Sequence, residues 1–85
     1  MPRSVFSDGY KSMLEVLVAA RKEASITQVE LAKRLGKPQP FISYVERGER
    51  RIDLIEFCAI AKAMGLEPEF LFKRVLEVLP DWLEI

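Results

Sequence analysis

The sequence contains no histidine and a single cysteine, Cys58. Zinc sites are built from cysteine thiolates and histidine imidazoles, and many cysteine nucleophiles need an imidazole base. Neither kind of site can be assembled from this chain, and one cysteine excludes an internal disulfide. The place of Cys58 among apolar residues indicates a small buried hydrophobic side chain. The sequence therefore predicts no metal and no cofactor.

Long apolar runs are also missing. No segment approaches the roughly 20 apolar residues that a helix needs to span a bilayer. The stretch MPRSVFSDGYKS at the start lacks the apolar core of a signal peptide. We therefore expect a cytoplasmic protein.

The charges are unevenly divided along a chain of 85 residues whose net charge is zero. Residues 1–51 hold 10 Lys/Arg and 6 Asp/Glu, whereas residues 52–85 hold 3 Lys/Arg and 7 Asp/Glu. Nucleic acid needs a basic face, and the total charge of the protein matters less. The cations nearest the central segment are Lys33, Arg34, Lys37, Arg47, Arg50 and Arg51.

Residues 27–48, TQVELAKRLGKPQPFISYVERG, have the pattern of two short helices joined by a tight turn. Thr27 is a good N-cap, and Glu30 three residues later completes a capping box. Leu31 and Leu35 then give a one-sided apolar stripe, and Gly36 is typical of a helix end. These features predict a helix over about residues 28–35.

A second helix follows the segment Pro38-Gln39-Pro40 and ends at Gly48. The residue before a proline is driven away from helical geometry, so we expect Gln39 to flank the helix and Pro40 to begin it. Ile42 and Val45 face the core. Helix, glycine turn and second helix is the layout of a helix-turn-helix, in which the second helix enters the DNA major groove.

Apolar periodicity predicts three further helices: from a cap at Ser7 or Asp8 to about Ala24, from the Asp53 N-cap to Gly65, and from Pro68 to about residue 79. We divide the chain into a flexible arm (1–7), a helix-turn-helix domain (8–79) and an apolar tail (80–85). Within the arm, Arg3 is either disordered or reaches a minor groove.

The chain resembles the Xre/Cro/CI family of lambda-repressor-like helix-turn-helix regulators over residues 10–72. The matching residues are Arg21, Thr27-Gln28, Leu31-Ala32, Gly36, Gln39, Phe41-Ile42-Ser43, residues 46–51 and residues 61–65. The resemblance implies an all-α fold, a compact five-helix domain with the helix-turn-helix at its second and third helices. Lys37-Pro38 and Pro40 depart from the family pattern, so the operator of a relative cannot be assumed.

Arg21 continues the apolar stripe of the first predicted helix. An unpaired buried charge is very costly, so this side chain needs a partner. In the resembling family, an arginine at this place pairs with the glutamate that closes the recognition helix, here Glu46. The resemblance implies an Arg21–Glu46 ion pair between the first and third helices; the alternative is that both side chains are exposed.

Base recognition is expected from four residues at the start and outer face of the recognition helix: Gln39, Pro40, Phe41 and Tyr44. The amide of Gln39 can donate to and accept from one adenine. Pro40 offers only apolar contact, and Tyr44 can touch a base edge or a phosphate. Phe41 either packs on a thymine methyl or is partly buried against the preceding helix.

Phosphate binding is expected from a second set of residues: Gln28, Lys37, Ser43, Arg47, Arg50 and Arg51. In this class the first helix of the motif crosses the DNA backbone, so Gln28 can offer its amide to a phosphate; otherwise it faces water. Loop arginines are ordinary surface in most proteins, but the helix-turn-helix context favours phosphate contacts.

The C-terminal part is more apolar than one small bundle needs. The residues assigned to a dimer or partner surface are Leu71, Val75, Val78, Leu79, Trp82, Leu83 and Ile85. Either the tail folds back over its own domain or this surface is buried against a second copy. We favour a homodimer, because two-fold symmetry is how this class binds paired half-sites.

We therefore expect a sequence-specific transcriptional regulator, a repressor acting as a homodimer on a palindromic operator. The alternative is an antitoxin or protein-binding module whose apolar C-terminus holds a partner protein, with DNA binding serving autoregulation. An enzyme is not expected, because no paired carboxylates, glycine-rich phosphate loop or metal-ligand spacing are present.

Overall fold

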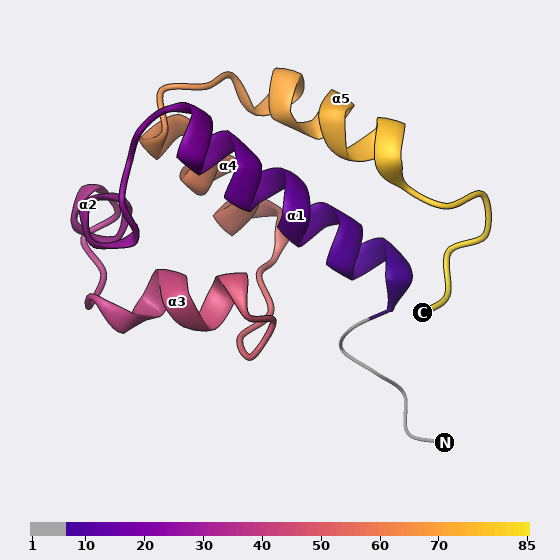
Figure 1. Cartoon of the computed structure of the whole chain (residues 1–85), viewed down its shortest axis with the longest axis horizontal. Coiled ribbons are helices and arrows are strands. Elements are labelled where there is room, and N and C mark those ends of the chain that lie inside the picture. The colour runs from indigo at the N-terminus through magenta and orange to yellow at the C-terminus, as the bar shows by residue number, and fades with distance from the viewer. Residues whose placement is uncertain (1–6) are drawn as a thin grey trace.

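A computed structural model describes residues 7–85 of the chain (Figure 1). This part of the chain contains five helices and no strand: α1 (Asp8–Glu23), α2 (Gln28–Arg34), α3 (Pro40–Glu46), α4 (Leu54–Ala63) and α5 (Pro68–Val78). The helices lie within one or two residues of the predicted limits, and the all-α fold class is confirmed. Both alternatives for Arg3, disorder and a minor-groove contact, concern residues outside the described part of the chain.

The long helix α1 lies between α5 on one side and α3 on the other (Figure 1). The short helix α2 packs against α3 and α4, and α4 packs against α5. Every helix sends apolar side chains into one core, whose most deeply buried large members are Leu31, Ile42, Val45 and Leu71. The two helices of the helix-turn-helix are thus mounted on a frame made by α1, α4 and α5.

Side-chain caps at Ser7, Thr27 and Asp53 fix the starts of α1, α2 and α4, whereas α3 and α5 each begin with a proline. The Thr27 hydroxyl accepts a hydrogen bond of 3.0 Å from Glu30 N–H, as predicted. The Glu30 carboxylate does not complete the expected capping box, because it accepts instead from Arg34 Nε one turn further on, at 3.1 Å. The full reciprocal box is found at the start of α4, between Asp53 and Glu56.

The turn between α2 and α3 begins at Gly36, whose φ of +68° lies in the left-handed region that favours glycine. Lys37 N–H then donates to the carbonyl oxygen of Ala32 at 2.9 Å and closes the end of α2. Figure 1 shows the short link that follows and the change of direction into α3.

Gln39 differs from its predicted conformation. As expected it precedes α3, which begins at Pro40, but its φ of −50° and ψ of −44° are helical. Phe41 N–H donates to the carbonyl oxygen of Pro38 at 3.0 Å, and this turn requires helical angles at Gln39. The hydrogen bond therefore offsets the local preference against a helical residue before proline.

Two residues of the predicted partner surface are buried in their own chain. Leu71 and Val75 are 0% and 4% exposed, so their assignment to an intermolecular surface is wrong. Both lie on the side of α5 that faces the core, which the wide apolar arc of α5 did not distinguish from its outer side. Val78, Trp82, Leu83 and Ile85 are exposed, and Leu79 is partly buried.

Leu71→Ala and Leu76→Ala compare the two sides of α5. The first substitution removes a fully buried side chain and leaves a cavity, so we expect the free energy of unfolding to fall by about 2–5 kcal/mol. Leu76 is exposed on the single chain, so its replacement should change the stability of the monomer by less than about 1 kcal/mol, measured at a protein concentration low enough to dissociate a dimer. Urea denaturation followed by circular dichroism measures both. Equal losses would contradict the division of α5 into a core side and an outer side.

Candidate nucleic-acid interface

The outer face of α3 is polar and open to solvent. Pro40 and Tyr44 are exposed, Ser43 is partly exposed and Arg47 follows directly at the end of the helix. At 100° per residue these four positions fall within one third of the helix circumference. Together with the exposed Gln39 at its start, α3 presents a continuous surface that includes three of the four residues predicted to contact bases, Gln39, Pro40 and Tyr44.

The position of α3 is set by Glu46, whose side chain lies between α3 and α1. Arg21 Nε donates to Glu46 Oε2 at 2.7 Å, and Arg21 Nη2 donates to Glu46 Oε1 at 3.1 Å. Both side chains are only 10% exposed, and Arg21 is the one charged residue that is buried among residues 7–85. The ion pair implied by the family resemblance is therefore present as a two-point contact.

The same carboxylate also holds the start of α2. Gln28 Nε2 donates to Glu46 Oε1 at 2.7 Å, while Arg21 Nη1 donates to the carbonyl oxygen of Ile26 at 2.8 Å. Sequence reasoning missed this role of Gln28 and assigned its amide to a phosphate. An amide nitrogen carries two hydrogens, so a phosphate contact of Gln28 remains possible beside the internal one and stays a prediction.

Arg47 is already engaged on the surface of the protein. Its Nε and Nη2 donate to the two carboxylate oxygens of Glu49 at 3.1 and 3.2 Å, and its Nη1 donates to the hydroxyl of Ser43. The guanidinium also lies 5.2 Å from the centre of the Tyr44 ring. Hydrogen bonding to Arg47 lowers the pKa of Glu49 below its usual value, and the same bond raises the pKa of Arg47. Both groups are therefore charged at neutral pH.

Arg50 is held in a similar way at the start of α4. Its Nη1 and Nη2 donate to the carboxylate of Glu56 at 3.0 and 2.8 Å. This hydrogen bond, followed by the one from Asp53 N–H, lowers the pKa of Glu56. The Arg50 guanidinium is 5.0 Å from the centre of the Phe41 ring, and Lys37 Nζ is 5.5 Å from it. Phe41 is partly buried against the core, which is the second of its two predicted environments.

The side chain of Arg51 lies against Tyr10 of α1. Its guanidinium is 4.2 Å from the centre of the Tyr10 ring, and Tyr10 in turn accepts a hydrogen bond from Ile52 N–H at 3.1 Å. These contacts fix the loop between α3 and α4 on the first turns of α1. Each of the four cations predicted to bind phosphate thus has a contact within the protein.

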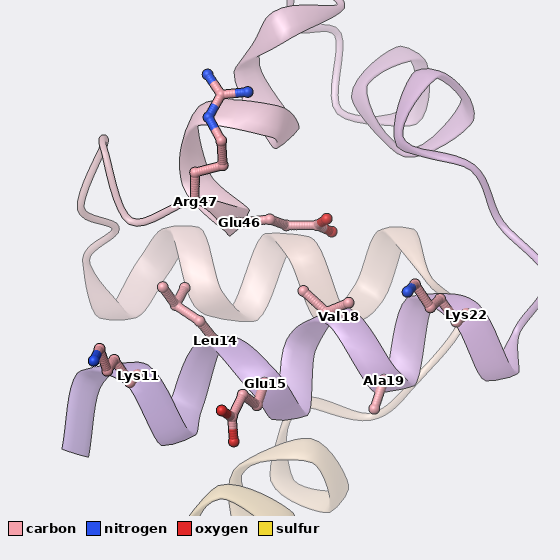
Figure 2. A pocket seen from close by; sticks show the side chains of 8 residues that line it. All are labelled: Lys11, Leu14, Glu15, Val18, Ala19, Lys22, Glu46 and Arg47. Atoms are coloured by element: carbon pink, nitrogen blue, oxygen red, sulfur yellow. The ribbon is translucent and has the colours of Figure 1, made fainter. Parts of the chain in front are cut away.

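A shallow hollow lies between α1 and the end of α3 (Figure 2). Its lining residues are Lys11, Leu14, Glu15, Val18, Ala19, Lys22, Glu46 and Arg47. Figure 2 shows Glu46 extended along α1 and Arg47 directed away from it. Two adjacent residues therefore have different roles. Glu46 holds α3 against α1, and Arg47 is part of the outer surface.

Residues 7–85 contain no group of three or more His, Cys, Asp or Glu side chains placed to hold a metal ion. Over the same residues, no helix has both the length and the apolar character needed to cross a membrane. What the chain does offer is a rigid polar helix face with arginines around it.

The comparisons with known proteins agree with this geometry. The family model described as Helix-turn-helix (HTH_3) matches residues 17–71. A solved structure, an XRE-family like protein from Pseudomonas syringae pv. tomato str. DC3000, is 42% identical to this chain with a TM-score of 0.79. The similarity covers 86% of this chain and 89% of that chain. Among curated proteins there is no match.

The fold and the exposed face of α3 define the chain as a helix-turn-helix domain, in which the second helix of the motif faces outward. The family match spans more than half of the chain, and the chain belongs to the XRE family of helix-turn-helix proteins. The family is one of DNA-binding transcription regulators, which places this chain among them.

Glu46→Gln and Glu23→Gln make the same chemical change in a buried and an exposed ion pair. Glu46→Gln leaves the Arg21 charge without its carboxylate, and we expect a loss of about 3–5 kcal/mol of unfolding free energy. Glu23, which pairs with Arg74, is mostly exposed, so its replacement should cost less than about 1 kcal/mol. Chemical denaturation measures both, and a loss below 1 kcal/mol for Glu46→Gln would show that the pair does not fix α3.

Proposed function

We propose that this protein is a cytoplasmic repressor that binds a palindromic operator as a homodimer. The observation that carries the proposal is the outer face of α3, which is exposed and polar while its inner face is locked by Glu46. A helix of this shape and exposure fits the major groove, where each base pair presents a distinct pattern of donors and acceptors.

Base contacts are assigned to the first two turns of α3. Gln39 stands exposed at the helix start with no capping hydrogen bond from its side chain, so its amide is available to an adenine. Tyr44 lies one turn further along the same face, and Pro40 adds apolar contact between them. Phe41 contributes less, because part of its ring is covered by the core.

Phosphate contacts are assigned to the side chains around that face. Ser43 and Arg47 lie along it, and Lys37 and Arg50 lie over Phe41 at its edge. Such contacts position a protein on the duplex without selecting its sequence. Binding through them should weaken as salt rises, with a slope of about 0.9 per phosphate neutralised.

The homodimer is supported by apolar side chains that the chain leaves in water. On α5 these are Phe70, Phe72, Leu76 and Val78, and in the tail they include Trp82 and Ile85. A two-fold dimer that binds DNA presents its two copies of α3 to paired half-sites. Repression then follows from occupancy, because a bound dimer blocks access of polymerase to the promoter.

A second function is favoured by the same exposed tail. Trp82 and Ile85 have almost no cover from their own chain, which also suits a protein partner held in place of a second copy. In that case DNA binding would be autoregulatory. The arrangement of the DNA site separates the two, since only a dimer requires two half-sites.

Selection of bound duplexes from random DNA, at low and moderate salt, tests the proposal. We expect two short half-sites whose centres lie about 10 base pairs or a multiple apart. Gln39→Ala should relax the preference at one position of each half-site and weaken binding by about 1–3 kcal/mol, because it loses a two-point contact. Lys62→Ala, an exposed change on α4, serves as the control and should leave the selected sequence unchanged.

The outcomes separate the parts of the proposal. Enrichment of one isolated half-site would contradict the homodimer and favour the protein-partner function. An unchanged site with Gln39→Ala would contradict the assignment of Gln39. No enrichment even at low salt would overturn sequence-specific DNA binding itself.

A further inference from the structure

Arg47 lies on the outer face of α3, and its guanidinium is paired with the carboxylate of Glu49. The two carboxylate oxygens of Glu49 face two nitrogens of the guanidinium at 3.1 and 3.2 Å. This is the same two-point geometry in which arginine binds a phosphate or the edge of a guanine. A DNA acceptor must therefore displace Glu49 before Arg47 can bind it in that way.

The backbone conformation, and not burial of the side chain, brings the Glu49 carboxylate to the Arg47 guanidinium. Glu49 N–H donates to the carbonyl oxygen of Tyr44 at 2.9 Å, which folds the chain after Gly48 back toward α3. Gly48 has a φ of +78°, a left-handed conformation that makes this reversal possible. The side chains of Arg47 and Glu49 are 52% and 53% exposed, so the pair can open without disturbing the core.

Resting on the proposed DNA binding, we propose that Glu49 is a specificity-determining residue that competes with DNA for the guanidinium of Arg47. It lowers the affinity for unrelated DNA more than the affinity for the operator. It acts through Arg47 and needs no contact with DNA of its own.

The discrimination follows from the geometry of the exchange. On the operator, the base contacts hold α3 at one place in the groove, so Arg47 meets an acceptor held in position that replaces both hydrogen bonds to Glu49. On unrelated DNA these base contacts are absent and the protein slides along the duplex, so no single acceptor is held in place for Arg47. The pair with Glu49 then stays closed, and the protein forfeits one phosphate contact.

Opening of the pair also carries an electrostatic penalty. The pKa of Glu49 is lowered by Arg47, so the carboxylate is ionised at neutral pH and is left beside the phosphates when Arg47 moves away. The like charges repel, and salt screens this repulsion only in part. Glu49 therefore weakens every DNA complex in which Arg47 does not regain two hydrogen bonds from a DNA acceptor.

The experiment measures affinity and salt dependence for two labelled duplexes, one of random sequence and one enriched by wild type in the selection. Glu49→Gln should tighten binding to the random duplex by about two- to five-fold and to the enriched duplex by less than two-fold. The salt slope on the random duplex should increase by about 0.9, because one more phosphate is neutralised.

Two controls isolate the role of Arg47. Glu77→Gln removes the same charge from an exposed position on α5 and should change neither affinity beyond the general effect of net charge. In an Arg47→Ala background, Glu49→Gln should have no effect beyond that of Glu77→Gln, because the guanidinium for which Glu49 and DNA compete is absent. A merely structural role of Glu49 would not produce this dependence on Arg47.

The results distinguish this proposal from the function on which it rests. If wild type binds and Glu49→Gln behaves like Glu77→Gln, the role of Glu49 is overturned and DNA binding stands. A gain that persists without Arg47, or that is equal on both duplexes, also overturns it. If wild type binds neither duplex, both the proposed function and the proposed role of Glu49 are overturned.

Discussion

One buried carboxylate determines how this domain presents its helix-turn-helix. Glu46 receives hydrogen bonds from Arg21 on α1 and from Gln28 at the start of α2, while it belongs to α3 itself. Taking an arginine and a glutamate out of water is costly unless their hydrogen-bonding groups find partners. Here Arg21 also donates to the backbone of Ile26, so the network closes at the entrance to α2. Three elements thereby share one point of attachment.

The outer face of α3 depends on that attachment. Ile42 and Val45 supply the apolar contacts beneath the helix, but apolar contacts alone tolerate small shifts and rotations. The directed hydrogen bonds at Glu46 fix the rotation of a helix of only seven residues. As a result Tyr44 and Arg47 point outward and Gln39 is held at one end, in the arrangement that a major-groove contact needs.

Much of this organisation could be predicted from the sequence. Periodicity, caps and glycines gave all five helices, and the proline before Phe41 gave the first residue of α3. The Arg21–Glu46 pair came from the family resemblance and is present in the structure. The helix signals work because each depends on residues only a few positions apart, whereas the Arg21–Glu46 pair joins residues 25 positions apart.

The failures concern choices that are made in three dimensions. The Glu30 carboxylate could accept from the N-cap backbone or from Arg34, and it accepts from Arg34. The Gln28 amide could face water, a phosphate or Glu46, and it donates to Glu46. The apolar arc of α5 was wider than one interface needs, but its width could not show that Leu71 belongs to the core. The Arg47–Glu49 pair was missed as well, because the backbone reversal after Gly48 brings the two side chains together.

The most direct test of the account is to map which backbone amides respond when duplex DNA is added, by two-dimensional NMR of the labelled protein. The account predicts that the amides of Gln39, Tyr44 and Arg47 shift most, with the loop at Arg50 next. The amide of Arg21 should shift little, because it lies behind α3. Large shifts confined to α5 and the tail, with the outer face of α3 unchanged, would contradict the claim that this face binds DNA.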